Sequence, residues 1–292
     1  MKSFAYTGGV AMEITTLIEN SKEDESSALL PEHGVSLFFQ TEKHTVLFDT
    51  GKSDRFLKNA QNLGVPITDV DTLVISHGHY DHGGGLKVFL LENNHAKVYL
   101  KEEAISGYYA KRGFLKKYIG LDRTLIDTHR ERFVFIKEDT EIDEGIFILS
   151  DIKDIHPRPS GNSFLYEKSG GKLILDRFLH ELILVIREDG GLVVFTGCSH
   201  RGILNMIETV ESSFKNTTIK GVLGGFHLMN PIKNRMSESE DVVRNIGRTL
   251  LQKKNLEMVY SGHCTGDEAY SLLKVEMKKK LNRFSTGKVI EM

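Results

Sequence analysis

One short stretch of the sequence constrains the chain more than any other. Residues 77–82 read H-G-H-Y-D-H, so three imidazoles and one carboxylate fall within six positions. The apolar, β-branched run 72–75 leads into this stretch and predicts a buried strand. Glycines at 83–85 follow it and let the backbone turn sharply before the next element. We therefore expect these polar side chains to gather at the end of a strand.

The residue types in this stretch indicate metal binding. Alternate residues of an extended segment face the same way, so His77 and His79 can share one face. Asp81 and His82 come after the bend and can reach a second point nearby. Neutral imidazoles bind zinc, iron and similar ions, and a carboxylate can complete such a site. The pattern predicts two neighbouring metal ions; the alternative is a polar loop whose histidines bond to each other and to solvent.

Composition narrows the class of protein. A chain of 292 residues, 40% hydrophobic and 27% charged, is typical of one large or two small globular domains. A net charge of -2 gives no electrostatic argument for nucleic acid. Residues 1–6 lack the pattern of a secretion signal, and no run of 18 apolar residues predicts a membrane span. We expect a cytoplasmic protein without nucleic-acid or membrane partners.

The motif H-x-H-x-D-H after a strand resembles the signature of the metallo-β-lactamase superfamily. The resemblance implies an α/β fold of four layers, an αββα sandwich with two mixed β-sheets face to face, outer helices, and metals at one edge. We expect one such domain over residues 1–292. A basic and aromatic segment around 103–130 is then expected to be an insertion that overhangs the metals and binds an anionic or planar substrate. The alternative is a solvated helix and loop packed on the sandwich.

Hydrophobic patterning and turn residues predict several further elements. A hairpin is expected from 35–39 and 45–49, a helix from 54 to 63 that Gly64 ends, a hairpin from 182–186 and 192–196, a helix over 203–214, a helix capped by Ser237, and a last helix from Asp267.

A carboxylate, Asp49, ends the second strand of the first hairpin and is followed by Thr50 and Gly51. Such a residue at the edge of a sheet can belong to a site or can simply form an Asx-type turn. In the superfamily, the aspartate of a matching D-T-G supports the metal loop from behind. The resemblance therefore makes Asp49 the candidate for that supporting role.

The strand 192–196 leads into Gly197-Cys198-Ser199-His200, and a strand that ends in Cys-x-His before a helix is a good ligand position. In the superfamily an aspartate that bridges the two metals is common where Cys198 stands. Cys198 can therefore ligate as a thiolate, act as a nucleophile beside the metals, or be inert. We favour His200 as a ligand, because its neutral imidazole completes a three-histidine set with His77 and His79. Cys198 and Cys264 both lie beside histidines, which favours metal-site or reactive roles over a disulfide.

The usual third histidine of the first superfamily site lies upstream of this strand, where Asp176 and His180 are the only substitutes. His180 starts an apolar strand and is alternatively a packed or solvated histidine. The Gly-His pair at 262–263 ends a strand and matches the final histidine ligand of the superfamily. The resemblance therefore assigns His263 to the second metal, together with Asp81 and His82.

His227 comes at the end of the strand-like run 222–228, after two glycines at 224 and 225. It is either a hydrogen-bonded loop histidine or a residue that faces the substrate and acts as a general acid or base.

A longer set of motifs resembles one branch of the superfamily, the metal-dependent hydrolases of β-lactamase superfamily II. In order along residues 48–266 the motifs are F-D-T-G, S-H-G-H-x-D-H-G-G-G, T-G-C-S-H-x-G-I, G-G-F-H-L and G-H-C-T-G. This branch includes archaeal dihydropterin–ribofuranosylaminobenzene phosphate synthases. The resemblance implies the fold and a metal centre at these residues, but the branch is functionally mixed and does not fix the reaction.

From these observations we expect an enzyme with two divalent metal ions, zinc foremost and iron or manganese as alternatives. The main hypothesis is a hydrolase of a phosphoester, ester or related small molecule, in which a metal-bound hydroxide attacks. Asp81 and His227 are the catalytic candidates, His227 as proton donor to the leaving group. The alternative is a dihydropterin-type transferase, in which the same metals hold a diphosphate leaving group and the aromatic segment 106–118 stacks on a planar, pterin-like ring.

Three other classes are less consistent with the sequence. Iron redox members of the superfamily typically carry Glu at the position of His79 and an added flavin domain, which this chain lacks. A nuclease is disfavoured by the nearly neutral charge. A binding module with purely structural metals would lack an open metal position.

Overall fold

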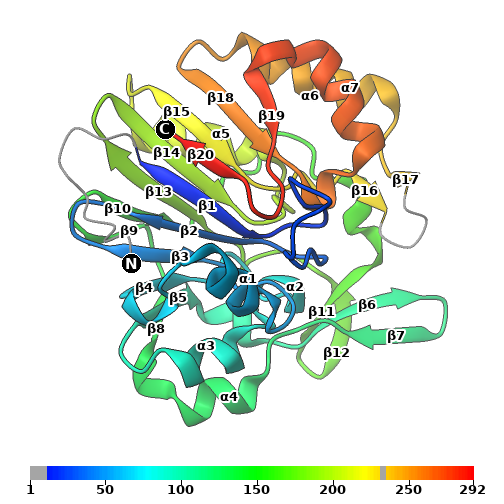
Figure 1. The fold of residues 1–292 in the computed structure, drawn as a ribbon. Coiled ribbons are helices and arrows are strands. Elements are labelled where there is room, and N and C mark those ends of the chain that lie inside the picture. Colours follow the sequence, from blue (N-terminus) through cyan, green and yellow to red (C-terminus); the bar gives the residue numbers. More distant parts are fainter. Residues whose placement is uncertain (1–11, 231–234) are drawn as a thin grey trace.

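Two β-sheets lie face to face and carry helices on both outer faces (Figure 1), which confirms the predicted four-layer arrangement. This computed structural model describes residues 12–230 and 235–292. The expectation for residues 1–6 lies outside these ranges. In the described part of the chain, no helix is long and apolar enough to cross a membrane.

Both sheets are mixed and have seven strands each. The first has the order β20-β1-β2-β3-β4-β5-β8, in which β3, β4, β5 and β8 run parallel and the other neighbours antiparallel. Its strands are β1 (Glu13–Ile18), β2 (Ser36–Gln40), β3 (Thr45–Phe48), β4 (Thr72–Val74), β5 (Lys97–Lys101), β8 (Phe133–Ile136) and β20 (Val289–Glu291).

The second sheet has the order β19-β18-β15-β14-β13-β10-β9, with a parallel half from β19 to β14 and an antiparallel half from β14 to β9. Its strands are β9 (Thr140–Asp143), β10 (Ile146–Leu149), β13 (Ile183–Glu188), β14 (Gly191–Thr196), β15 (Ile219–Leu223), β18 (Leu256–Ser261) and β19 (Leu281–Arg283).

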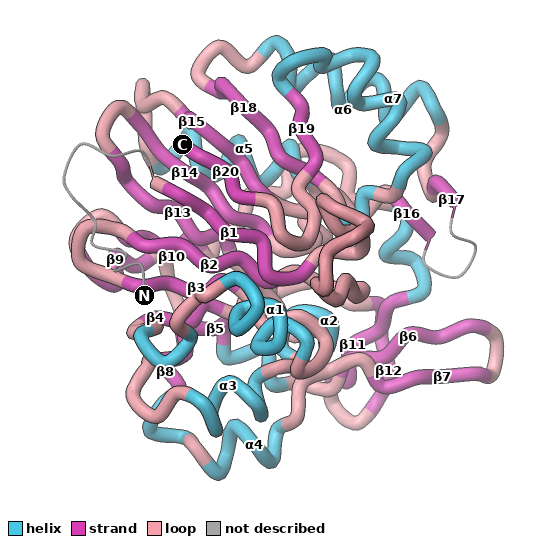
Figure 2. The backbone as a smooth tube through the Cα atoms, viewed as in Figure 1, coloured by secondary structure: helices cyan, strands magenta, loops and turns pink. Residues whose placement is uncertain are grey.

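Three apolar layers hold the sandwich together. The layer between the sheets includes Phe39 and Phe195, whose rings stack at 4.5 Å. Apolar residues outside the first sheet pack under one group of helices, and those outside the second sheet pack under another. Figure 2 shows these two groups of helices on the outside of the sandwich. The helices are α1 (Arg55–Leu63), α2 (Tyr80–Gly83), α3 (Leu86–Glu92), α4 (Arg123–Thr128), α5 (Ile203–Ser213), α6 (Glu240–Gln252) and α7 (Asp267–Met277). Short 3-10 helices cover Ile67–Asp69, Glu102–Ile105, Arg130–Arg132, Ser160–Phe164, His263–Thr265 and Lys278–Lys280.

Local sequence signals explain where several elements end. Gly64 closes α1 in the left-handed conformation, at a φ of 71°, which glycine adopts without a steric penalty. The predicted cap of α6 is wrong by two residues. Ser239 is the N-cap and accepts a hydrogen bond from the Val242 amide, whereas the Ser237 hydroxyl donates to the Leu228 carbonyl. The helix begins later because residues 229–230 and 235–236 first form the small hairpin of β16 (Met229–Asn230) and β17 (Arg235–Met236).

The segment around 103–130 contains a β-hairpin followed by the short helix α4, and its role as an insertion over the metals stays a prediction. Strands β6 (Tyr108–Arg112) and β7 (Leu115–Tyr118) pair antiparallel. They join β11 (Leu165–Ser169) and β12 (Lys172–Leu175) in a separate four-stranded sheet of order β12-β11-β6-β7. This sheet projects from one end of the sandwich (Figures 1 and 2).

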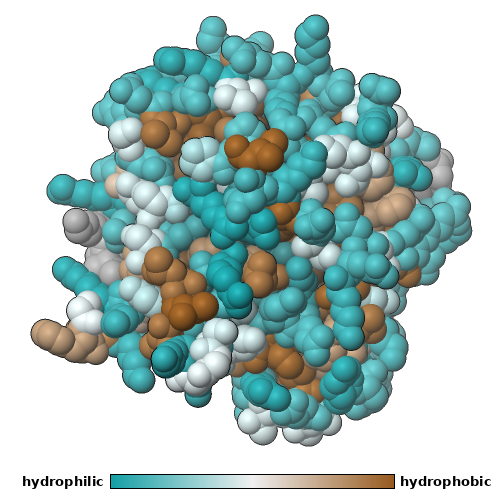
Figure 3. Space-filling view, turned by 180° about the vertical axis from the view of Figure 1, so that it is seen from behind, coloured by the Kyte–Doolittle hydropathy of each residue, from teal (hydrophilic) through white to brown (hydrophobic). Residues whose placement is uncertain are grey.

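The surface seen from behind in Figure 3 is mainly hydrophilic, with separate hydrophobic areas. This pattern agrees with the 27% of charged residues in the chain. The residues of ligand type lie at the strand ends. Asp49 and His77 follow the parallel strands β3 and β4, while Cys198, His227 and His263 follow the parallel strands β14, β15 and β18.

Candidate metal centre

The first candidate ligand set joins His77, His79 and His200, whose ligand atoms lie within 4.8 Å of one another. All three side chains are buried, and burial lowers the pKa of each imidazole, so the neutral, metal-binding form is favoured. The Nε2 atom of each ring has no hydrogen-bond partner within the described residues. A buried polar atom without a partner costs about 1–3 kcal/mol, so three of them facing one point fit a bound cation.

Neighbouring side chains hold this set in place from behind. The His77 ring nitrogen Nδ1 lies 2.9 Å from the Ser76 hydroxyl, and His200 Nδ1 lies 3.0 Å from the Asn162 amide oxygen. The buried Glu181 carboxylate accepts a hydrogen bond of 2.7 Å from the His200 amide. These contacts occupy one ring nitrogen of His77 and of His200 and leave Nε2 for a ligand, the usual arrangement around metal-binding histidines.

The second candidate set contains Asp81, His82, Cys198 and His263, again with ligand atoms within 4.8 Å. The Cys198 sulfur lies 3.2 Å from His82 Nε2 and 3.3 Å from His263 Nε2. The Asp81 carboxylate lies 3.5 Å from His263 Nε2. The geometry therefore agrees with the predicted division of the ligands into two neighbouring sets. That these two sets bind metal stays a prediction. Cys198 belongs to the second set by position.

Asp49 lies directly behind the metal loop. Its carboxylate accepts hydrogen bonds from the Ser76 amide at 2.8 Å and the Ser76 hydroxyl at 2.7 Å, and it lies 2.6 Å from His82 Nδ1. A carboxylate can only accept, so Nδ1 carries the proton and Nε2 faces Cys198. Burial lowers the pKa of His82, but the Asp49 and Asp81 carboxylates outweigh burial and raise it to about 9.

Asp176 and His180 lie behind the first set. His180 Nδ1 accepts a hydrogen bond of 2.8 Å from the Gly78 amide, so its proton is on Nε2, which lies 3.2 Å from Asp176. Both ring nitrogens of His180 are thus used within the protein, which corresponds to the packed histidine of the alternative interpretation. Its ring also lies 4.0 Å from the ring of Tyr108. Asp176, 3.8 Å from His79 Nε2, faces both histidines. Burial raises the pKa of its carboxyl, but the electrostatic and hydrogen-bonding contacts with the two rings outweigh burial and hold the pKa far below the usual range.

The sequence reasoning missed three residues around the second set. His33 Nε2 lies 3.2 Å from the Asp81 carboxylate. Asn20 Oδ1 lies 2.9 Å from His263 Nδ1, and the buried Glu19 accepts from the His263 amide at 2.5 Å. Glu19 directly follows the apolar strand β1, which is the signal that identified Asp49 after β3. No comparable pattern marks His33 in its loop.

Strained backbone marks the same region. Asp49, Ser199, His227 and His263 all have a positive φ, between 49° and 59°. Non-glycine residues rarely adopt this conformation, which costs about 1–3 kcal/mol and is found mostly at functional sites. His227 is buried, its ring lies 4.1 Å from the ring of His200, and neither of its nitrogens has a hydrogen-bond partner in the described part of the chain.

The two sets open on one cavity of about 290 Å³. Its lining residues are His33, His79, Tyr80, Asp81, Ala110, Lys117, Ile119, Phe164, Leu165, Cys198, His200, His227, Met229 and Cys264. The segment 103–130 contributes Ala110, Lys117 and Ile119, but the aromatic lining comes from Tyr80 and Phe164 outside it. The expected aromatic platform within 106–118 is therefore wrong: Tyr108 packs behind the loop on His180, and Phe114 is fully exposed.

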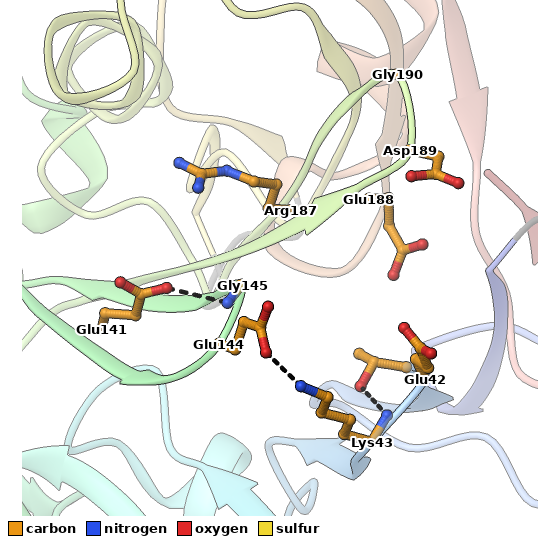
Figure 4. Close-up of a pocket in the computed structure, with 10 residues that line it drawn as sticks. Glu42, Lys43, Glu141, Glu144, Gly145, Arg187, Glu188, Asp189 and Gly190 are labelled. Atoms are coloured by element: carbon orange, nitrogen blue, oxygen red, sulfur yellow. Dashed lines mark hydrogen bonds and ion pairs between the residues drawn. The ribbon is translucent and has the colours of Figure 1, made fainter. Parts of the chain in front are cut away.

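A second pocket, of about 430 Å³, is larger but lies at the opposite end of the strands (Figure 4). It is formed by the turns before β3, before β10 and before β14. Its charged lining consists of Glu42, Lys43, Glu141, Glu144, Arg187, Glu188 and Asp189. None of the candidate ligands lines this pocket, and Lys43 is paired with Glu144, so its size does not make it the candidate site.

Comparisons with known proteins agree with the fold. The family model of the Metallo-beta-lactamase superfamily matches residues 29–175. The structure resembles the crystal structure of Tm1679, a metal-dependent hydrolase of the beta-lactamase superfamily, with 34% identity, a TM-score of 0.80, and coverage of 96% of this chain and 99% of that chain. Zn²⁺-bound PqqB from Methylobacterium extorquens, at 10% identity and a TM-score of 0.58 over 96% of this chain and 100% of that chain, shares the fold alone.

One relative is named after the product that it synthesises. It is the 7,8-dihydropterin-6-methyl-4-(β-D-ribofuranosyl)-aminobenzene-5′-phosphate synthase of Methanocaldococcus jannaschii, 28% identical over 281 residues, which cover 91% of this chain and 92% of the relative. This finding overturns the main functional hypothesis. A small-molecule hydrolase that uses a metal-bound hydroxide is not supported, and the transferase alternative fits the relative better.

Proposed function

Because the chain belongs to the metallo-β-lactamase superfamily, we propose that it is a metal-dependent transferase that moves a pterin-type group from a diphosphate-activated donor to an acceptor. The synthase of Methanocaldococcus jannaschii, which matches nearly the whole chain, supports this reaction class. The observation that carries the proposal is the shared cavity, in which both ligand sets face an apolar wall and Lys117.

The proposed ligands are His77, His79 and His200 for one divalent ion, and Asp81, His82 and His263 with Cys198 for the other. Their unpartnered or mutually facing donor atoms fit such ions, with zinc foremost. When bound, the ions would supply Lewis-acid stabilisation of the charge that develops on the diphosphate leaving group.

The substrate is proposed to lie between the ligand sets and the apolar wall. Phe164, Leu165 and Ile119 offer a surface for a planar ring, and Tyr80 lies beside them. Among the residues that the structure describes, Lys117 is the lysine that lines the cavity, and its Nζ lies 4.9 Å from the centroid of the Tyr80 ring. An ammonium at this position would bind a phosphate group. We include in the proposal that the hairpin of segment 103–130 covers the substrate and supplies this lysine.

His33 is the proposed base for the proton that the acceptor loses. Its Nε2 faces the Asp81 carboxylate at 3.2 Å, so Asp81 fixes the proton there and leaves Nδ1 to accept another. In the proposed step, a bond forms between the pterin methylene carbon and the acceptor nitrogen. The carbon–oxygen bond to diphosphate breaks with its electron pair, and the acceptor proton moves to His33 Nδ1. The role of His227 as a proton donor stays a prediction.

The test is a turnover assay with 6-hydroxymethyl-7,8-dihydropterin diphosphate as donor and a ribofuranosyl-aminobenzene phosphate as acceptor. We expect diphosphate release that depends on the acceptor, with the joined product detected by mass spectrometry. Release of diphosphate at the same rate without acceptor would identify a hydrolase and contradict the proposal.

Lys117 allows a matched pair of variants. Lys117→Ala removes the proposed phosphate contact and should raise KM for the phosphorylated substrate about tenfold, with a smaller change in kcat. Lys116→Ala changes the neighbouring lysine, whose Nζ instead lies 5.9 Å from the ring of Tyr109, and should leave KM unchanged. Equal effects of the two substitutions would rule out a specific contact by Lys117.

A further inference from the structure

Two thiols and an imidazole lie together beside the second ligand set. The sulfur atoms of Cys198 and Cys264 and a ring nitrogen of His227 are all within 4.8 Å of one another. The three residues are 3%, 4% and 6% exposed, and both cysteines are free thiols. They follow three different strands, β14, β18 and β15, so the fold and not the local sequence brings them together.

His227 provides an independent sign of a ligand at this place. Its side chain is more than nine-tenths buried, and neither ring nitrogen finds a hydrogen-bond partner among residues 12–230 and 235–292. Its backbone also has a φ of 49°. Burial without a partner and a left-handed backbone both cost free energy, and a bound group that accepts the imidazole lone pair would offset that cost.

The surroundings of Cys264 suit a sulfur atom that carries negative charge. The His227 amide donates to the Cys264 sulfur at 3.3 Å, and such N–H donors stabilise a thiolate. Gly225 leaves the room for the thiol, because a Cβ at this position would lie only 2.4 Å from the Cys264 sulfur. The absence of a side chain at 225 is therefore required by the position of this sulfur.

We propose that Cys198, Cys264 and His227 form a third metal site, specific for a soft divalent cation of the zinc class. Two thiolates and one neutral imidazole are a typical zinc donor set, and a fourth position would face the cavity, which all three residues line. The Cys198 thiolate also faces His82 and His263, so it would bridge this site and the second set. The metal needs one nitrogen of His227 and leaves the other free.

Cobalt titration of the metal-free protein tests the site, because cobalt bound to thiolate absorbs in the near ultraviolet. The wild-type protein should bind three equivalents and show this absorption. Cys264→Ser should bind two equivalents and lose much of the absorption, and His227→Ala should also bind two. His95→Ala, which changes an exposed histidine outside the cavity, should match the wild type. Wild-type stoichiometry and absorption in Cys264→Ser would overturn the proposal.

A second measurement needs no substitution and therefore does not depend on whether a variant folds. Crystals of the wild-type protein loaded with cadmium should show an anomalous peak between the sulfur atoms of Cys198 and Cys264 and the ring of His227. Peaks at the two histidine-containing sets without this third peak would overturn the proposal. They would leave the proposed transferase reaction standing, since that reaction is judged by acceptor-dependent turnover.

Discussion

Asp49 connects the first sheet to the candidate metal centre through three contacts. It follows β3, its φ is 59°, and its buried carboxylate contacts both Ser76 and His82. Burying a carboxylate away from water costs free energy unless hydrogen-bond donors surround it, and these contacts supply such donors. The carboxylate in turn fixes the orientation of the donors. One residue thus sets both the turn after β4 and the tautomer of His82.

Asp49→Asn should weaken metal binding and lower stability. The amide keeps the shape but loses the charge that opposes His82, so we expect metal affinity to fall about 10–100-fold. The free energy of unfolding of the metal-free protein should fall by about 2–4 kcal/mol. Chelator competition and urea unfolding measure the two effects.

Asp143→Asn is the matched control, because it alters a carboxylate–histidine pair at the surface, 3.1 Å from His44. It should cost less than about 1 kcal/mol and leave metal affinity unchanged. If Asp49→Asn and Asp143→Asn changed metal affinity and the free energy of unfolding equally, the buried position of Asp49 would have no special role in either.

Sequence alone could predict the ligands that occur in short motifs. Residues 77–82 show four candidates together, and His200 and His263 each follow an apolar strand in a short motif that contains glycine and cysteine. His33 and Asn162 could not be found in this way, because they act only through contacts with Asp81 and His200 across long sequence separations. Such contacts leave no periodicity in the chain.

At the scale of elements, strand ends decide where the site forms. The parallel strands β3 and β4 of one sheet and β14, β15 and β18 of the other end at the same edge of the sandwich. Their amphipathic or apolar runs could be predicted from the sequence. The hairpin of β6 and β7 could not, because β7 is exposed along its whole length and thus lacks an alternating pattern.

Ser239→Ala tests the corrected start of α6. The Ser239 side chain accepts from the Val242 amide at 3.4 Å, so its loss should lower the free energy of unfolding by about 1 kcal/mol. Urea unfolding measures this change. Ser271→Ala, within α7, is the control and should cause no loss, since alanine has the higher helix propensity. A loss for Ser271→Ala as large as that for Ser239→Ala would contradict the assignment of the cap.

At the scale of the molecule, the contact between the two sheets supports both halves of the site. Phe195 stacks on Phe39 at 4.5 Å and lies 5.6 Å from Phe48, and all three side chains are fully buried. Phe195 is one residue before the end of β14, which leads directly to Cys198. Core packing and ligand placement are therefore coupled here.

Phe195→Ala should lower the free energy of unfolding by about 3–5 kcal/mol, because it leaves a cavity between the sheets. Leu91→Ala, at a residue 77% exposed on α3, should change it by less than about 0.5 kcal/mol. Urea unfolding of both variants provides the comparison. A small effect of Phe195→Ala would show that the sheets are not held together at this point.

Metal removal should lower the thermal stability of the whole molecule. Metal at 100 times its Kd stabilises the folded state by about 2.7 kcal/mol, which corresponds to a Tm about 4 °C higher for a domain of this size. Calorimetry with and without chelator measures the shift. In a variant with both His77→Ala and His200→Ala, chelator should lower the Tm by less than it does in the wild-type protein. An unchanged Tm of the wild-type protein after complete metal removal would contradict metal binding at the two sets.

The candidate ligands of each set come from both halves of the chain, and this has a consequence for biosynthesis. His77 and His79 need His200, and Asp81 and His82 need His263, so neither set is complete until most of the chain has left the ribosome. Proteins are made from the N-terminus, so the histidine-rich loop emerges first, without its partners. Metal loading of the proposed sites should therefore follow translation of at least the first 200 residues, and an ion captured early by the loop alone would be held by an incomplete set.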